Sequence, residues 1–150
     1  MVTNETTIII HRPVTTVFTY IADLQKGPQW QTGLLEVRQT DQSPIKVGTQ
    51  FTSVRKFMGR KLETNVEVVT YELNSKLDIR STSGPVPFEQ WYFFEPTAEG
   101  TRLTSKIQLH TGGLFGLAEP LIAASANREM EAAFGDLKGL LESHAYEPAA

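Results

Sequence analysis

The sequence predicts an α+β fold in which a curved antiparallel sheet closes over one long C-terminal helix. Helical periodicity occurs only near the two ends of the chain, in residues 12–24 and 119–143. Between them, apolar and polar residues alternate with a period of two, and Gly and Pro interrupt the alternation, as is typical of strands joined by turns. Such a sheet tends to enclose a pocket, so a ligand pocket is the main functional hypothesis.

The first strand and the first helices are expected before residue 31. Three consecutive β-branched residues, Ile8 to Ile10, predict a strand. Pro13 then fits the first turn of a helix, where its missing N–H would have no partner anyway. Gly27 and Pro28 are expected to end this helix, and Trp30 follows on a second short helical turn. The apolar face of the first helix consists of Val14, Val17, Phe18, Ile21 and Leu24.

The rest of the sheet is predicted from segments that turn signals separate: residues 34–40, 48–57, 62–71, 77–82, 88–95 and 101–110. Met58-Gly59-Arg60 reads as a compact hairpin connection. In residues 62–71 the apolar side chains fall on one face and Glu63, Asn65 and Glu67 on the other. One face of the sheet is therefore expected to be covered and the other to face solvent.

The last helix is expected to begin at Glu119, after Gly112, Gly113 and Gly116. Its apolar stripe consists of Ala123, Ala126, Met130, Phe134, Leu137 and Leu141. The charged residues beside the stripe, Glu129 among them, are assigned to the solvent-facing surface. Because no internal repeat and no linker interrupts the pattern, residues 1–150 are expected to form a single domain.

Composition excludes several classes of function. The chain has 14 Lys and Arg against 17 Asp and Glu, a formal net charge of −3, which gives no electrostatic reason to expect nucleic acid. The absence of cysteine excludes disulfides, thiolate catalysis and Cys-ligated zinc. Residues 1–7 lack the features of a signal peptide, and no apolar run is long enough to span a membrane. A cytoplasmic location is expected by elimination.

Landmarks that carry a family resemblance are spread along nearly the whole chain: Arg12-Pro13-Val14, Val17-Phe18, Asp23, Pro28, Trp30, Gly48-Thr49, Phe51, Phe57-Met58-Gly59-Arg60, Phe88-Glu89, Tyr92, Phe94-Glu95-Pro96, Gly100-Thr101-Arg102-Leu103-Thr104, Leu137-Lys138 and Leu141-Glu142. Their order and spacing resemble the START/SRPBCC superfamily, and within it the polyketide cyclase/dehydrase-like branch. The resemblance implies a helix-grip fold: seven antiparallel strands around a long C-terminal helix, with two small helices between the first two strands. It also implies binding of lipids, sterols, hormones or polyketide intermediates, and in a minority of members cyclisation or dehydration. None of the matched motifs is a catalytic signature, so the fold alone does not establish an enzyme.

The candidate ligand-binding residues are Trp30, Phe51, Arg55, Phe57, Met58, Phe88, Gln90, Tyr92, Phe94, Leu114, Phe115, Met130 and Phe134. The strand aromatics among them fall on inward-facing positions, where they would form either a cavity wall or a packed core. In the resembled fold, Trp30 stands where a lid covers one end of the cavity; a core role that pins the helix pair to the sheet is the favoured interpretation, ligand contact is the alternative, and both can hold together. The Phe57-Met58 hairpin and the Leu114-Phe115 segment would lie on opposite sides of the pocket mouth. The expected ligand is small and largely apolar (lipid-, polyketide- or aromatic-like), with Tyr92, Gln90 or Arg55 orienting its polar group.

Arg55 shares the strand parity of Phe51 and Phe57, so it would face inward and pair with an acidic residue or a ligand carboxylate. A bulge or register shift that leaves Arg55 in solvent is the favoured alternative. A cyclase or dehydratase is the rival function, and it needs a titratable group inside the cavity. Only His110, Arg55 and Tyr92 are candidates, since the carboxylates are mostly assigned to the solvent-facing side. We therefore predict no catalytic residue, no metal site and no cofactor; His11, His110 and His144 do not have the spacing of a metal motif.

Trp91 and Phe93 fall on the opposite face of their strand from Phe88, Tyr92 and Phe94. Two large aromatics on the outer face of a sheet suggest a contact patch, and a homodimer through this face is the preferred explanation. Coverage by long neighbouring side chains such as Arg102, Lys106 and Glu89 is the alternative.

Overall fold

The computed structural model describes residues 1–57 and 59–144, with the side chains of Leu114 and Phe115 left aside. Within these residues a seven-stranded antiparallel sheet has the strand order β1-β7-β6-β5-β4-β3-β2. The strands are β1 (Val2–Ile10), β2 (Leu34–Gln39), β3 (Gln50–Phe57), β4 (Arg60–Glu72), β5 (Lys76–Ser83), β6 (Phe88–Thr97) and β7 (Gly100–Leu109). The helices are α1 (Val14–Ala22), the 3₁₀-helix η1 (Leu24–Gln29), α2 (Leu114–Leu117) and α3 (Glu119–Glu142).

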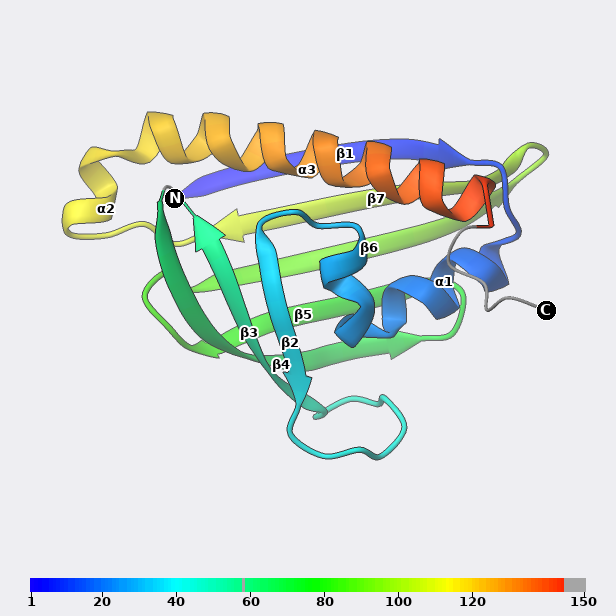
Figure 1. Cartoon of the computed structure of the whole chain (residues 1–150), viewed down its shortest axis with the longest axis horizontal. Helices are drawn as coiled ribbons and strands as arrows, with labels where there is room; N and C mark the ends of the chain where they lie inside the picture. Colours follow the sequence, from blue (N-terminus) through cyan, green and yellow to red (C-terminus); the bar gives the residue numbers. More distant parts are fainter. Residues whose placement is uncertain (58, 145–150) are drawn as a thin grey trace.

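The sheet is a succession of neighbouring strands that curls over α3 (Figure 1). From β2 to β7 each strand pairs with the next strand in the sequence, and β1 pairs with β7. The strands on either side of α1 and η1, β1 and β2, therefore form the two edges of the sheet. Bulges at Leu34/Glu36, Asn65/Val66 and Val68/Thr70 bend the strands. The helix-grip fold predicted from the sequence is confirmed.

Two local predictions differ from the structure. Strand β1 begins at Val2 rather than at Ile8, because its polar first half pairs with β7 along the whole strand, from Val2 opposite Leu109. Gly27 and Pro28 lie inside η1 instead of ending α1, which stops at Ala22. Gly27 allows close packing there, since a Cβ at this position would lie only 2.7 Å from Leu34 Cδ2 and the Leu34 side chain would have to shift.

The core lies between the concave face of the sheet and the helices. In β4, Thr64, Val66 and Val68 are buried while Glu63 and Asn65 are exposed, which confirms the predicted division between a covered and a solvent-facing side. Helix α3 spans the concave face, and α1 lies against the same face near the C-terminal half of α3 (Figure 1). Among the described helices, none has the length and apolar character needed to cross a membrane.

Candidate ligand cavity

A cavity of about 410 Å³ lies between α3 and the concave face of the sheet, and it reaches the C-terminal end of α1 at Ile21. Its volume falls within the range of roughly 300–1,000 Å³ that is usual for small-molecule sites. Most of its wall is apolar, with side chains from the end of α1, from η1 and the segment after it, from strands β2 to β7 and from α3. The large apolar groups in the wall include Trp30, Leu34, Phe51, Phe57, Phe88 and Met130.

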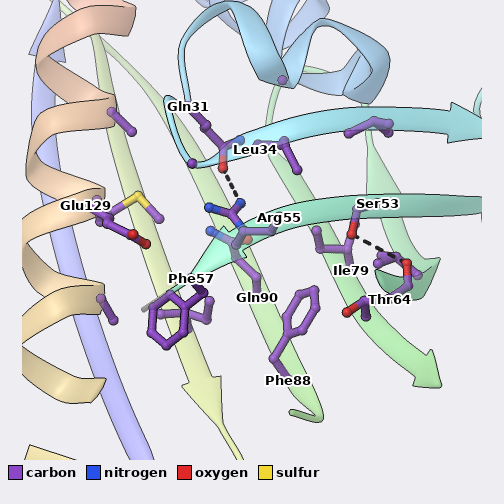
Figure 2. Close-up of a pocket in the computed structure, with 18 of the residues that line it drawn as sticks. Gln31, Leu34, Ser53, Arg55, Phe57, Thr64, Ile79, Phe88, Gln90 and Glu129 are labelled. Carbon is purple, nitrogen blue, oxygen red and sulfur yellow. Dashed lines mark hydrogen bonds between the residues drawn. The ribbon is translucent and has the colours of Figure 1, made fainter. Parts of the chain in front are cut away.

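Arg55 projects into this cavity from β3 (Figure 2). Phe51, Ser53, Arg55 and Phe57 all line the cavity, because the pairing of β3 with β4 is uninterrupted along the strand. The irregularity next to Arg55 falls in β2 instead, between Leu34 and Glu36. The expectation that a bulge leaves Arg55 in solvent is therefore wrong.

The Arg55 guanidinium is held by a neutral partner. Its Nη2 donates a hydrogen bond of 2.7 Å to Gln31 Oε1. Burial lowers the pKa of Arg55, and the nearby Glu129 and Tyr92 oppose that change. The guanidinium has five N–H donors and keeps its proton in proteins, so donors remain for another acceptor.

Glu129 is the residue that the sequence interpretation missed. It lies on α3 immediately before Met130, is half-buried and lines the cavity, although it was assigned to the solvent-facing surface. Burial raises the pKa of its carboxyl group, while Arg55 and Arg128 oppose that rise. In Figure 2, Arg55 lies between Gln31 and Glu129, so the cavity contains one cation and one titratable acid close together.

Tyr92 and Gln90 supply the polar groups of β6. Gln90 Nε2 donates a 3.1 Å hydrogen bond to Ser105 Oγ. The Tyr92 hydroxyl forms no hydrogen bond with any residue in the described part of the chain. Burial raises the pKa of Tyr92, so the hydroxyl keeps its proton and remains a donor. A buried hydroxyl normally has a hydrogen-bond partner, and a ligand in the cavity would be in a position to supply an acceptor for the Tyr92 hydroxyl.

The other predicted site residues divide into three groups. Trp30, Phe51, Phe57, Phe88 and Met130 line the cavity as expected. Phe94 and Phe134 do not: the Phe94 ring packs edge-to-face on Phe18 at 4.9 Å, and Phe134 lies against Trp30 with ring centres 6.3 Å apart. For Phe94 the core alternative holds, and Phe134 also belongs to the core. Met58 and the side chains of Leu114 and Phe115 lie outside the described residues.

His110, the third candidate for an enzymatic role, is exposed and is not among the residues that line the cavity. The acid–base groups that the described cavity does hold are Arg55, Tyr92 and Glu129. The chemistry available there is therefore hydrogen-bond donation by Arg55 and Tyr92, and proton exchange by Glu129.

On the convex face, Trp91 and Phe93 are half-buried rather than fully exposed. The Phe93 ring has Lys76 Nζ at 5.5 Å and Lys106 Nζ at 5.6 Å from its centre, within the range of a cation–π contact. Lys76 also pairs with Asp78 at 3.3 Å. Long neighbouring side chains thus cover Phe93: Lys106, as the alternative expected, and Lys76 in addition.

Comparisons with known proteins agree with the fold. The model of the family described as "Polyketide cyclase / dehydrase and lipid transport" matches residues 1–142. TTHA0849 from Thermus thermophilus superposes with a TM-score of 0.79 at 20% identity, covering 96% of this chain and 98% of that one. A START superfamily protein from Mycobacterium smegmatis gives a TM-score of 0.75 at 17% identity, with coverage of 95% and 98%.

The di-domain ARO/CYC StfQ from the steffimycin biosynthetic pathway gives a TM-score of 0.71 at 14% identity, covering 97% of this chain and 46% of that one. At these identities the structural likenesses show a shared fold. No curated protein sequence matches the chain. The family model, which covers almost the entire chain, goes further than the fold: this chain belongs to the polyketide cyclase/dehydrase and lipid transport family.

Proposed function

We propose that the protein binds a small, largely apolar molecule (lipid-, polyketide- or aromatic-like) in the cavity between α3 and the sheet. The observation that carries the proposal is the cavity of about 410 Å³ with its mainly apolar wall. Protein interiors are normally packed to the density of organic crystals, so a space of this size calls for an explanation. A ligand that fills it gains about 0.8 kcal/mol for each methylene group it buries.

The polar groups of the cavity orient the ligand in this proposal. Arg55 comes from β3, and Gln90 and Tyr92 come from β6, with β4 and β5 between them in the sheet, yet all three line the same cavity. Few polar groups in an apolar wall are typical of sites that bind apolar bodies with one or two polar substituents. The family description, which names lipid transport as well as cyclisation and dehydration, is consistent with such ligands.

Native mass spectrometry of the purified protein tests the proposal. We expect a co-purified molecule that organic solvent extracts, and its loss in Ala126→Phe, because Ala126 lines the cavity and a phenyl ring would fill part of it. Ala124→Phe is the matched control, since Ala124 is exposed on the same helix and does not line the cavity. If the wild type carries no ligand and binds no apolar probe, the proposal fails.

An acid–base enzyme is a second candidate, favoured by the titratable Glu129 inside the cavity with its raised pKa. On a β-hydroxy ketone, Glu129 would remove the proton beside the carbonyl while Arg55 and Tyr92 hydrogen-bond the developing oxyanion. Glu129 would then return that proton to the departing hydroxyl group, which leaves as water. Mass spectrometry of 4-hydroxy-4-phenylbutan-2-one incubated with wild type and Glu129→Gln tests this: unchanged substrate in both samples contradicts catalysis on this class.

A homodimer through Trp91 and Phe93 and a cytoplasmic location stay predictions. The lysines around Phe93 reduce the exposed apolar area that an interface would bury. Size-exclusion chromatography of wild type and of a Trp91→Ala, Phe93→Ala double variant distinguishes the cases. Elution of the wild type as a monomer contradicts the dimer.

A further inference from the structure

One side of the cavity wall holds two opposite charges that do not touch. Among the described residues, Glu129 has no hydrogen bond, and its carboxylate and the Arg55 guanidinium are more than 4.0 Å apart. Both groups nevertheless lie beside Gly33. A Cβ at Gly33 would be 3.6 Å from Glu129 Oε1 and 3.7 Å from Arg55 Nη1. Because both distances start from the same point, Glu129 Oε1 and Arg55 Nη1 are at most about 7.3 Å apart.

The range that these distances leave, from 4.0 Å to about 7.3 Å, includes the separation that one bridging atom needs. A hydrogen bond between heavy atoms is about 2.9 Å long, so one oxygen bonded to both groups spans up to about 5.8 Å. The missing side chain of Gly33 keeps the space open. A Cβ there would also lie 3.2 Å from the Lys56 backbone carbonyl oxygen, so the added methyl group could not easily move away from Glu129 and Arg55.

The chemistry of the two groups restricts what can bridge them. A guanidinium only donates hydrogen bonds, and an ionised carboxylate only accepts them. A bridging group must therefore accept from Arg55 and donate to Glu129, which a hydroxyl group does with one oxygen. A ligand carboxylate has no proton to donate and is repelled by Glu129, and an ammonium group is repelled by Arg55. An ether or ketone oxygen satisfies Arg55 but leaves Glu129 desolvated without a partner, which is costly.

We propose that the ligand is an apolar alcohol or phenol whose hydroxyl group bridges Arg55 and Glu129 over Gly33. This inference rests on the proposed function and specifies the class of ligand. The apolar body then extends along the wall formed by Phe57, Phe88 and Met130. Gln31, which accepts from Arg55, holds the guanidinium in the orientation that the bridge requires.

Three probes that differ in one substituent test the proposal: 2-naphthol, naphthalene and 2-naphthoate, titrated by isothermal calorimetry at pH 7. We expect wild type to bind 2-naphthol roughly tenfold more tightly than either of the others, as is usual for a hydrogen bond to a charged group. Glu129→Gln should bind 2-naphthoate roughly tenfold more tightly than wild type does, because the Arg55 charge is no longer offset. Glu131→Gln, which makes the same change at an exposed position of α3, should behave as wild type.

Gly33→Ala provides a second variant that leaves both charges in place. It should lose the preference for 2-naphthol and keep the affinity for naphthalene. Equal binding of 2-naphthol and naphthalene by wild type, or tighter binding of 2-naphthoate, would overturn the hydroxyl bridge while the cavity still binds ligand. Failure of all three probes to bind wild type contradicts the proposed function itself.

Discussion

Two stretches of α3 cover the same concave face of one sheet, yet the C-terminal stretch is packed and the middle stretch lies over a cavity. In the C-terminal half, Leu137 and Leu141 are fully buried, and α1 adds Phe18 against Phe94 of β6. In the middle of the helix, the residues that face the sheet include Ala126, Met130 and Ala133, and the cavity lies beneath them. Figure 1 shows α1 near the packed end, and of its residues only Ile21 lines the cavity.

The sheet itself does not differ between the ends in the way that the helices do. Strand β6 places buried side chains at both, with Gln90 and Tyr92 at the hollow end and Phe94 at the packed end. Alternation along a strand therefore tells which face a side chain occupies, but not whether the space above it is filled. Small residues on the facing helix and the reach of α1 decide that, so the cavity arises from what α3 lacks.

The largest expected effect comes from removing an aromatic ring at the packed end. Phe18→Ala should lower the free energy of unfolding by about 4 kcal/mol, because a fully buried ring leaves a cavity in a tightly packed region. Phe51→Ala should cost only about 2 kcal/mol, since one side of that ring already faces empty space and has fewer contacts to lose. Urea denaturation measures both.

Phe18 and Phe51 are matched for this test, with 0% and 2% of their surfaces exposed. Equal losses for the two variants would mean that the cavity end is as well packed as the α1 end, and would remove the contrast. A larger loss for Phe51→Ala would reverse it.

A smaller effect is expected from adding volume. Ala126→Phe should raise the free energy of unfolding by about 1 kcal/mol, because the ring enters space that is already present. Val17→Phe, on the fully buried face of α1, should lower it by about 2 kcal/mol through overpacking. Thermal unfolding followed by circular dichroism gives the sign of each change; destabilisation by both variants would contradict the presence of usable space beneath α3.

The same contrast explains how far the sequence could predict the molecule. The strands and the long helix follow from alternation, periodicity and turn residues, all of which are local, whereas their arrangement as a helix-grip fold follows from the family resemblance. Phe88 and Phe94 share a parity and differ only in what packs above them, which is a property of the tertiary structure. Arg55 was misjudged because the bulge beside it belongs to the neighbouring strand β2.

Glu129 was missed for a related reason. On a helix, an acidic residue beside an apolar stripe normally faces solvent, and nothing local marks it as a cavity residue. A signal was present nonetheless: Glu129 lies three residues after Ala126 and four before Ala133, positions that share one face of a helix. Only the approach of Gly33 and Arg55 in space makes that position functional.

The smallest expected effect is a pH dependence of stability that arises from Glu129, the titratable carboxyl group in the cavity. Because the pKa of Glu129 is raised in the folded protein, folding favours its protonated form. The stabilising effect of that proton is fully present below the unfolded-state pKa and is lost as pH rises through the folded-state value. Glu129→Gln, which keeps the neutral shape at every pH, should therefore gain stability relative to wild type as the pH rises from 4 to 7.

The gain should be a few tenths of a kcal/mol, since Glu129 is half-buried and solvent screens its charge. Arg55 and Arg128, the charged groups that act on Glu129 from β3 and from α3, limit it further. Urea denaturation at several pH values measures the difference between the two proteins, with Glu131→Gln as the exposed control. A stability difference that shrinks as pH rises would show that Arg55 stabilises the Glu129 carboxylate more than burial destabilises it, so that the two charges act as an ion pair without a ligand between them.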